Sequence, residues 1–328
     1  MQTHPQQSRA MSIVDLRQLN VRQLEPLLQE ESRFWREELR WDYRNSIDLI
    51  RRFVDARSLA GSAILENGQA AGYAFYVIED CKGLIGGLFV SPRYDQLKLA
   101  SELLADVPAT LRALPHISRI EVQLMPFGSP LDSVLAGQGF RLFPRNFMML
   151  DFPPDDSPLS YADAARTTAA SALLLERWDH RFFDAASRLI QLAYANHVDG
   201  EINDQYRTQS GALKFLKNII VLPGCGQFLP EASFVLRLPH TPELTGIVLT
   251  STVSPGVAHT TQICVMPGYQ GHGLGRLLLD ASIQALRARS YSALSLTVTA
   301  ANSRACLLYE HMGFRTIKSF SAGVWYAR

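Results

Sequence analysis

The sequence has little of what marks several common protein classes. Its four cysteines lie far apart, form no Cys-x-x-Cys pair and show no metal-ligand spacing, so we expect reduced thiols and no metal site. Lysine and arginine (32 residues) nearly balance aspartate and glutamate (31 residues), and the basic residues form no block. A dedicated nucleic-acid or anionic-membrane partner is therefore not expected.

Long hydrophobic runs are absent as well. None reaches the length of a transmembrane helix, and residues 1–11 are polar and lack the apolar core of a signal peptide, so we expect a cytoplasmic protein. Nevertheless 47% of the 328 residues are hydrophobic, which is enough to bury substantial cores. The length favours two domains over one.

Three landmarks recur along the chain at a nearly constant offset, which indicates duplication of a whole domain. They are Gly72 and Gly246, Val90-x-Pro92-x-Tyr94 and Val265-x-Pro267-x-Tyr269, and Gly139-Phe140-Arg141 and Gly313-Phe314-Arg315, at offsets of 174, 175 and 174. Residues 153–171, rich in Pro, Ser, Thr and Ala, are predicted to be a linker. The predicted domains are therefore residues 12–152 and 172–328.

Local patterns within each copy predict alternating helices and strands. In the first copy, helical spacing runs from Leu16 to Phe53, and Asn67-Gly68 between two apolar runs is typical of a β-hairpin turn. Further predicted elements are strands at 84–90, 119–124 and 147–151 and helices near 97–104 and 131–136 in the first copy, and helices at 182–195 and up to 220 and strands at 233–238 and 244–253 in the second.

The segment from Val265 to Arg276 is predicted to be a strand, a glycine loop and the start of a helix. Backbone N–H groups at such a helix N-terminus suit a phosphate, and glycine lets a ligand approach the backbone closely. A P-loop is excluded because Arg276-Leu277 stands where Lys-Ser/Thr is required. The dinucleotide pattern G-x-G-x-x-G is excluded because Arg276 or Leu278 stands where its last glycine is required.

The pattern that does fit is Gln/Arg-x-x-Gly-x-Gly/Ala, in Gln270-Gly271-His272-Gly273-Leu274-Gly275. It resembles the pyrophosphate-binding loop of the GNAT superfamily of acetyl-CoA-dependent N-acetyltransferases. The segment from Asn302 to Phe314 is similar to that family's Asn-x-x-Ala-x-x-Leu-Tyr-x-x-x-Gly-Phe signature. The resemblance implies an α/β fold of two tandem GNAT-like domains, each with a twisted mixed, mostly antiparallel sheet flanked by helices.

The resemblance also assigns roles for binding acetyl-CoA. The backbone of Gly271, His272, Gly273, Leu274, Gly275 and Arg276 would hold the pyrophosphate, with Gln270 fixing the start of the loop. The backbone of Ile263 and Val265 would pair with the pantetheine arm, because the family's strand splays from its neighbour here. Asn302 is predicted to cap the following helix. A glycine-rich strand–helix turn without a ligand is the alternative.

Two residues are candidates for proton transfer. Tyr309 lies seven residues after Asn302, on the same face of the predicted helix, and in the family a tyrosine here is the usual general acid. His259 lies six residues before Val265, which places both on one face of an extended strand, and it is the candidate general base. The alternatives are a tyrosine held by a carbonyl and an ordinary histidine at the start of a strand.

A polar corner between the first two helices of the second copy would face the acceptor. It contains His197, Asp199, Glu201 and Tyr206, and Thr297 and Thr299 are candidates to line the cleft from a nearby strand. By the resemblance these carboxylates would meet a cationic or polyhydroxylated amine. A solvated surface corner explains them as well.

The first copy lacks the glycines of the loop. After Tyr94 it continues Asp95-Gln96-Leu97, and it has no tyrosine equivalent to Tyr309. We therefore expect that this copy does not bind acetyl-CoA productively and supports the second. Such a tandem pair is similar in architecture to mycothiol synthase, although nothing in the sequence indicates that enzyme's substrate.

The predicted function is acyl transfer, acetyl by default, from CoA to the primary amine of a small molecule by direct attack on the thioester. The alternatives are a protein N-acetyltransferase and a non-catalytic acyl-CoA sensor using the same loop. The chain is predicted to be a monomer or a homodimer.

Overall fold

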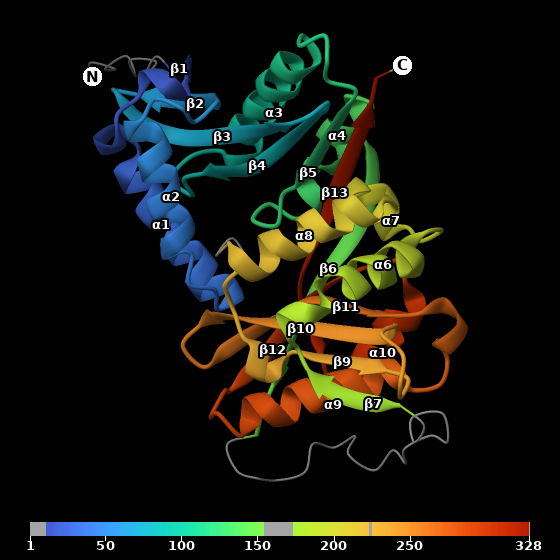
Figure 1. Ribbon diagram of the computed structural model, residues 1–328. Helices are drawn as coiled ribbons and strands as arrows, with labels where there is room; N and C mark the ends of the chain where they lie inside the picture. Colours follow the sequence, from blue (N-terminus) through green and yellow to red (C-terminus); the bar gives the residue numbers. More distant parts are fainter. Residues whose placement is uncertain (1–10, 154–172, 223–224, 328) are drawn as a thin grey trace, which may run out of the picture. The chain divides into compact units, whose positions relative to one another are not determined.

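The computed structural model describes residues 11–153, 173–222 and 225–327, which form two compact units (Figure 1). Unit 1 contains the described residues up to Glu38, Tyr43–Leu142 and the residues from Phe320 onward. Unit 2 contains Leu39–Asp42 and the described residues between Phe143 and Ser319. The predicted linker, 153–171, falls outside the described residues apart from its first residue.

Unit 1 is a mixed sheet with the strand order β1-β2-β3-β4-β5, followed by the C-terminal part of β13. Its elements are β1 (Met11–Asp15), α1 (Val21–Leu39), α2 (Arg44–Asp55), β2 (Gly61–Glu66), β3 (Gln69–Glu79), β4 (Lys82–Val90), α3 (Gln96–Arg112), β5 (Arg119–Gln123), α4 (Asp132–Gly137) and β13 (Arg315–Tyr326). The predicted hairpin is confirmed, because Asn67 and Gly68 link β2 to β3 with positive φ angles of 52° and 77°.

The sheet of unit 1 has helices on both faces. On one face the apolar residues of α3, which recur at spacings of three and four, pack on β4 and β5. On the other face α1 and α2 cover Tyr73 and Phe89 with their own apolar stripes. The helical region predicted from Leu16 to Phe53 is thus two helices, which separate near Arg40, where φ is 53°.

Unit 2 has the same plan, with the strand order β13-β6-β12-β11-β10-β9-β7 and β8 paired to β10. Its elements are β6 (Arg141–Asp151), β7 (Leu174–Arg177), α6 (Phe183–Tyr194), α7 (Asp199–Ile202), η4 (Asp204–Arg207), α8 (Gln209–Val221), β8 (Gln227–Phe228), β9 (Phe234–Arg237), β10 (Leu244–Ser254), β11 (Val257–Val265), η6 (Pro267–Tyr269), α9 (Leu274–Arg287), β12 (Ala293–Thr299) and α10 (Ser303–His311). Helices α6 and α8 cover one face of the sheet, and α9 and α10 cover the other.

These observations confirm the predicted fold class of two α/β domains with mostly antiparallel mixed sheets. The domain boundaries differ at Leu39–Asp42, which belongs to unit 2, and at the last strand of each copy. The part of β6 after Leu142 belongs to unit 2, where it pairs with β12, and the part of β13 after Ser319 belongs to unit 1, where it pairs with β5. The predicted boundaries had assigned both segments to the opposite unit.

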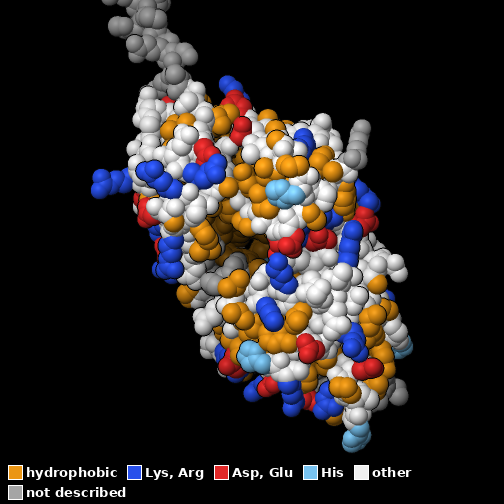
Figure 2. Space-filling view, turned by 45° about the horizontal axis from the view of Figure 1, so that its top comes forward, with side chains coloured by type: hydrophobic (Ala, Val, Ile, Leu, Met, Phe, Trp, Pro, Cys, Tyr) orange, Lys and Arg blue, Asp and Glu red, His pale blue; other side chains and the backbone are white. Residues whose placement is uncertain are grey.

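The surface has no sharp division of charge on the side in view, since Figure 2 shows Lys and Arg interspersed with Asp and Glu. Among the described helices none is both long and apolar enough to cross a membrane.

A buried carboxyl group in unit 1 leads to a first prediction. Glu31 on α1 is 2% exposed and accepts a hydrogen bond of 2.6 Å from the Tyr73 hydroxyl. Burial raises the pKa of Glu31 to about 7. Because the unfolded chain releases this proton near pH 4.5, stability falls between about pH 4.5 and 7, by about 3 kcal/mol in total.

Glu31→Gln is therefore expected to remove this loss. Urea unfolding of the variant should change little between pH 5 and pH 8, whereas the wild-type protein weakens over that range. The exposed Glu37→Gln, on the same helix, is the matched control. A variant with the wild-type pH dependence would show that Glu31 is not the titrating group.

Candidate functional site

The glycine loop of unit 2 has the backbone conformation that a phosphate-binding turn needs. Gly271 and Gly273 have φ angles of 86° and 76°, which side chains other than glycine rarely adopt. Gly273 is the N-cap of α9 and provides no side-chain cap. The first N–H groups of α9 are therefore free of a capping side chain, at the positive end of the helix dipole.

The equivalent helix of unit 1 begins differently. Asp95 is the N-cap of α3, and its carboxylate accepts a 3.0 Å hydrogen bond from the backbone N–H of Lys98. The end of this helix is thus satisfied by a negative group of the chain itself. A diphosphate at this place would meet the charge of Asp95.

One feature of the loop is kept in both copies. Gln270 donates from Nε2 to the Val265 carbonyl at 3.1 Å, and Gln96 donates to the Val90 carbonyl at 2.9 Å. Each glutamine thereby holds the chain that follows the strand back onto the strand's last residue. Gln270 fixes the start of the loop as the sequence predicted.

Strands β11 and β12 separate beside the loop. Their parallel pairing joins Val257–Thr260 to Ala293–Leu296. Beyond Thr260, β11 continues to Val265, paired on its other side with β10. Within the described residues, the end of β11 thus has no strand partner on one edge, although the carbonyls of Ile263 and Val265 accept hydrogen bonds from the side chains of Tyr194 and Gln270. A ligand can add its own amide groups to an edge without a strand partner.

This edge borders a cavity of about 430 Å³. Eleven of the predicted site residues line it: His197, Ile263, Val265, Gln270, Gly271, Gly273, Leu274, Gly275, Arg276, Asn302 and Tyr309. His272, Asp199, Tyr206 and His259 are not among its lining residues. The structure therefore brings the glycine loop, the open strand edge and Tyr309 together around one space.

The caps of α10 place Tyr309 in this cavity. Asn302 caps the helix as predicted, accepting a 3.2 Å hydrogen bond from the backbone N–H three residues on. At the other end Gly313 has φ 89°, and the N–H of Phe314 donates to the Tyr309 carbonyl at 3.0 Å. This is a Schellman motif, and its usual hydrophobic contact joins the rings of Tyr309 and Phe314, 5.9 Å apart.

The environment of Tyr309 keeps its hydroxyl protonated. The residue is 6% exposed, and burial, with the charge of Asp199 as the next cause, raises the pKa of the phenol. The Tyr309 side chain forms no hydrogen bond with the residues that the structure describes, so its proton is available to a ligand in the cavity. A tyrosine held by a carbonyl, the alternative in the sequence, is not what is found.

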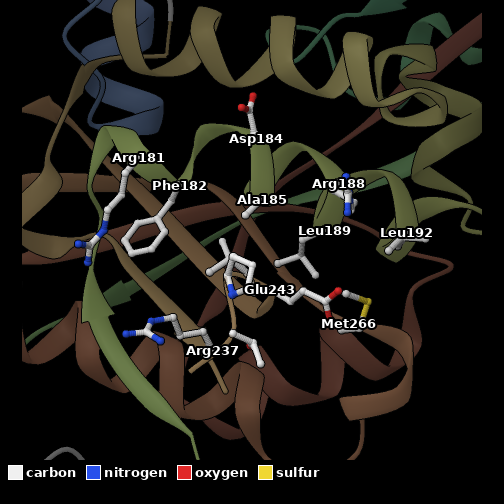
Figure 3. Close-up of a pocket in the computed structure, with 13 residues that line it drawn as sticks. Arg181, Phe182, Asp184, Ala185, Arg188, Leu189, Leu192, Arg237, Glu243 and Met266 are labelled. Atoms are coloured by element: carbon white, nitrogen blue, oxygen red, sulfur yellow. The ribbon is translucent and has the colours of Figure 1, made fainter. Parts of the chain in front are cut away.

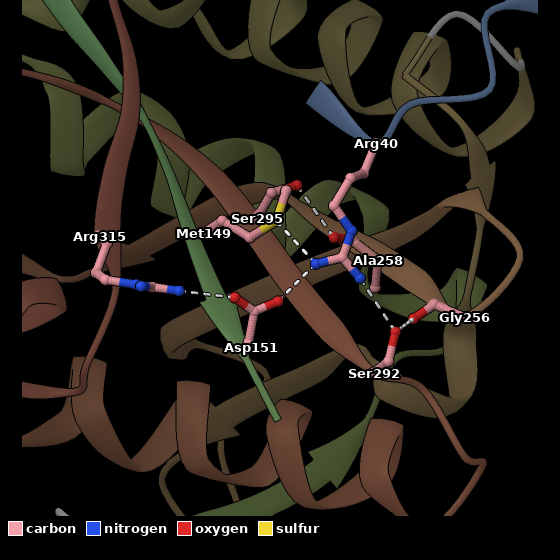
Figure 4. Close-up of polar contacts among 8 residues, drawn as sticks. All are labelled: Arg40, Met149, Asp151, Gly256, Ala258, Ser292, Ser295 and Arg315. Carbon is pink, nitrogen blue, oxygen red and sulfur yellow. Dashed lines mark hydrogen bonds and ion pairs between the residues drawn. The ribbon is translucent and has the colours of Figure 1, made fainter. Parts of the chain in front are cut away.

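His259 lies elsewhere, and its predicted role as the base needs correction. It is 8% exposed and sits between the rings of Trp41 and Phe147, at centroid distances of 5.0 and 5.8 Å. Ser295 Oγ donates its proton to the Ala258 carbonyl (Figure 4). The 2.9 Å contact between Ser295 Oγ and His259 Nδ1 is therefore an N–H donated by the histidine. Burial lowers the pKa of His259 to about 3.

A β-bulge explains the error. Leu249 faces Gln262 but Thr250 faces Thr260, so Thr261 is an extra residue in β11. It reverses the alternation of side chains, and Val265 packs with α9 while His259 faces the opposite side of the sheet.

Trp41 is held over His259 by its neighbour Arg40. Arg40 contacts Asp151 Oδ1 at 2.5 Å and Ser292 Oγ at 3.2 Å, and Arg315 contacts the other oxygen of Asp151 at 2.9 Å (Figure 4). These contacts fix the segment Leu39–Asp42 on unit 2. Because these contacts keep Trp41 packed on His259, they favour a structural role for this histidine.

The predicted polar corner comes close to Tyr309. Asp199 lies on α7, and its Oδ1 accepts a hydrogen bond from the Thr299 hydroxyl at the end of β12. Its Oδ2 is 3.5 Å from Nδ1 of His197, which lines the cavity. Glu201 lies on the same short helix.

Tyr194 connects this corner to the open strand edge, and the sequence analysis did not single it out. Its ring lines the cavity and stacks on Tyr206 at 4.5 Å. Its hydroxyl donates to the Ile263 carbonyl at 3.3 Å and accepts from Gln262 at 3.2 Å. The Tyr206 hydroxyl in turn donates to Gln262 at 3.4 Å.

Arg304 is a second cavity residue that the sequence analysis missed. It occupies the second position of α10, and Arg276 occupies the third position of α9. The helix dipole disfavours a cation in the first turn, so two such arginines lining one cavity suit an anionic ligand, although Arg276 also lies 3.7 Å from Asp280. An arginine in the first turn of a predicted helix is visible in the sequence, so Arg304 could have been recognised as a candidate site residue.

A second cavity, of about 580 Å³, lies on the side of α6 shown in Figure 3. Its walls come from α6, the β9–β10 connection and Met266, and they carry Arg181, Arg188, Arg237, Asp184 and Glu243. Leu192 and Met266 line this second cavity. Their neighbours in the chain, Ala193 and Val265, line the glycine-loop cavity. Positive and negative side chains nearly balance here, unlike at the glycine loop.

Unit 1 has a smaller groove, of about 330 Å³, at the place equivalent to the glycine-loop cavity. Phe89 lines it from β4, Pro92 from the following loop and Gln96 from the first position of α3. Its helix wall, α1, contributes three glutamates and one arginine: Glu30, Glu37, Glu38 and Arg33. Such a wall is unfavourable for a phosphate.

Comparison with known proteins identifies the family. The model of the acetyltransferase (GNAT) family matches residues 21–127 and 206–314, more than half of the chain and one stretch in each copy. The chain therefore belongs to the GNAT family and is a tandem member of it. The enzyme class of this family is that of the N-acetyltransferases.

Particular relatives match over shorter stretches. Over 63 residues the chain is 46% identical to mycothiol acetyltransferase of Beutenbergia cavernae, which covers 18% of this chain and 21% of that protein. Over 52 residues it is 48% identical to the ribosomal protein bS18-alanine N-acetyltransferase of Escherichia coli K12, covering 16% of this chain and 35% of that protein. The matches thus span about a fifth to a third of these relatives.

Solved structures share the fold over most of the chain. A GCN5-related N-acetyltransferase from Sphaerobacter thermophilus superimposes with a TM-score of 0.62 at 14% identity, covering 85% of both chains. A tandem GNAT protein from the clavulanic acid biosynthesis pathway gives a TM-score of 0.61 at 14% identity, covering 97% of this chain and 99% of that one. At this identity the likeness concerns the fold alone.

Proposed function

We propose that the protein transfers an acetyl group from acetyl-CoA to a primary amine and that unit 2 carries the active site. The observation that supports this most is the single cavity that joins the uncapped glycine loop, the open edge of β11 and the Tyr309 hydroxyl. In a GNAT family member, these three features correspond to sites for the diphosphate, the pantetheine arm and the thioester sulfur.

The proposed reaction uses each of these groups once. The N–H groups at the start of α9 bind the diphosphate, and the open edge of β11 aligns the thioester. The amine nitrogen attacks the carbonyl carbon directly, and the C–S bond breaks. Tyr309 donates its proton to the departing thiolate, for which a protonated phenol is needed.

Unit 1 is proposed to have no part in this chemistry. The carboxylate of Asp95 takes the phosphate position at α3, and the glutamates of α1 line the adjacent groove. Gln96 keeps its bond to the strand because that bond serves the loop rather than the ligand. The retained role of the unit is structural support.

A small-molecule amine is the proposed acceptor, since the polar corner with Asp199 and His197 offers a compact site for one ammonium group. A protein N-terminus is the second candidate, supported by the local identity to the bS18-alanine N-acetyltransferase. We continue to predict a monomer or a homodimer in the cytoplasm.

A panel assay tests the proposal. Release of free CoA from acetyl-CoA would be measured with amino sugars, polyamines, aromatic amines, amino acids and a peptide beginning with alanine. Turnover confined to small amines is expected, and turnover confined to the peptide would favour the second candidate. Tight acetyl-CoA binding without release by any amine would instead indicate an acyl-CoA sensor.

The arginine at the start of α10 gives a prediction about affinity. Arg304→Ala should weaken acetyl-CoA binding roughly tenfold, because a charge-assisted contact with the diphosphate is lost. Isothermal titration calorimetry measures the effect. Arg188→Ala is the matched control, since Arg188 lines the second cavity. Equal effects of the two substitutions would argue against an anion at Arg304.

A further inference from the structure

An aliphatic acceptor amine is an ammonium ion near pH 7 and must lose a proton before it attacks, yet His259 is enclosed between the rings of Trp41 and Phe147 on the opposite side of the sheet. We propose that Asp199 accepts this proton and afterwards returns it to Tyr309. The proposal rests on the proposed function and adds the base that the reaction requires.

Asp199 is held in a defined position among the groups of the site. The Thr299 hydroxyl donates to its Oδ1, which leaves Oδ2 as the acceptor for a substrate proton. Asp199 does not itself line the cavity, but its side chain is 17% exposed and its Oδ2 lies 3.5 Å from Nδ1 of His197, which does, so a ligand beside His197 comes within reach of it. The negative charge of Asp199 raises the pKa of each of the three phenols around it, those of Tyr194, Tyr206 and Tyr309.

His197 is unsuited to be the base, although it lines the cavity. Its Nδ1 accepts a 3.2 Å hydrogen bond from the backbone N–H of Asp199. The lone pair of Nδ1 is therefore occupied, and in the neutral ring Nε2 carries the proton. His197 can donate to a substrate but has no free lone pair to receive its proton.

The tyrosines and cysteines that face this space are protonated at neutral pH. Burial raises the pKa of the phenols of Tyr194 and Tyr206, and it raises the pKa of the Cys264 thiol to about 12. Cys306 on α10 is shifted in the same direction. Arg145 on β6 is a cation whose charge acts on Tyr206. Two carboxylates act on these groups: Glu310 is exposed on α10 and acts on Cys306, whereas Asp199 acts on the phenols and is the proposed base.

The proton balance closes within the site. Asp199 takes one proton from the ammonium, and the free amine forms the C–N bond to give a tetrahedral adduct, from which the C–S bond then breaks. Tyr309 gives its proton to the CoA thiolate and becomes a phenolate. The protonated Asp199 then returns its proton to the Tyr309 phenolate. The second proton of the amine, released from the tetrahedral adduct, goes to solvent.

The test compares Asp199→Asn with the wild-type protein across pH 6 to 10, using the best amine of the panel. At low pH kcat/KM should fall about 100-fold or more, since the variant must wait for the rare neutral amine. The deficit should shrink as pH rises towards the pKa of the amine. Asp184→Asn, an exposed carboxylate on α6, is the matched control. A deficit that is equal at every pH would reveal a merely structural role and overturn the proposal.

Slow hydrolysis of bound acetyl-CoA is a second readout that needs no amine, because the same base would activate water. Asp199→Asn should lower the hydrolysis rate at least tenfold, with acetyl-CoA affinity unchanged. Equal hydrolysis by the variant and the wild-type protein would overturn the assignment of Asp199. Failure of every amine in the panel would count against the proposed function. The hydrolysis assay needs no amine, so it tests the role of Asp199 separately from the proposed function.

Discussion

Tyr309→Phe is expected to lower kcat by about 100-fold or more while leaving the affinity for acetyl-CoA nearly unchanged. The substitution removes one hydroxyl from a ring whose packing on Phe314 is kept, so the cavity retains its shape. Without that proton donor the thiolate must leave unprotonated or take its proton from water. Steady-state kinetics and calorimetric binding on the same preparation measure the two quantities.

The matched control for this substitution is Tyr291→Phe. The Tyr291 hydroxyl contacts Thr252 at 2.6 Å and lies outside the set of residues that line the glycine-loop cavity. Its loss should cost about 1 kcal/mol of stability and little activity. If Tyr309→Phe retained the wild-type kcat, the acid would have to be another group.

The second large effect is expected at Gly273. Saturating acetyl-CoA at a hundred times its Kd should stabilise the folded protein by about 2.7 kcal/mol, and this gain should vanish in Gly273→Glu. The φ angle of 76° strains any side chain at this position, and a carboxylate there would repel the diphosphate.

Two controls make this result specific. Gly268→Ala, in the same loop region, adds a Cβ that meets no atom within 4 Å and should keep the ligand-induced gain. Asp95→Gly, which removes the cap of α3 in unit 1, should keep it as well. Unfolding of each variant without ligand shows whether the fold survives. A gain that persisted in Gly273→Glu would refute the assignment of the loop.

The fold and the glycine loop could be predicted because their signals are local. The turn Asn67-Gly68, the N-cap Asn302 and the glycines of the loop each act through the backbone of a few residues. The nearly constant offset between the copies then extended these local predictions to the whole chain. The resemblance to the GNAT family depended on the same short segments.

The position of His259 could not be predicted from the count of residues in the strand. A single inserted residue, Thr261, leaves no mark in the pattern of hydrophobic residues, yet it moves every preceding side chain to the other face. The pairing of the last strands, β6 and β13, was missed for a related reason. Their alternation fits either sheet, and the choice depends on contacts distant in sequence.

Tyr194 and Arg304 lie on helices with ordinary spacing, and only the cavity shows what they share. Arg304 could have been noticed, because a cation in the first turn of a helix opposes the dipole. Tyr194 offered no such signal, since an aromatic residue near a helix end is usually part of a core.

A crystal structure of the protein grown with acetyl-CoA would decide where the cofactor binds. We predict one molecule per chain, with its diphosphate on the N–H groups between Gly271 and Arg276 and its sulfur near the Tyr309 hydroxyl. A molecule bound instead at Asp95 and the groove of unit 1, or a glycine loop that stays empty at saturating ligand, would contradict the assignment of the active site to unit 2.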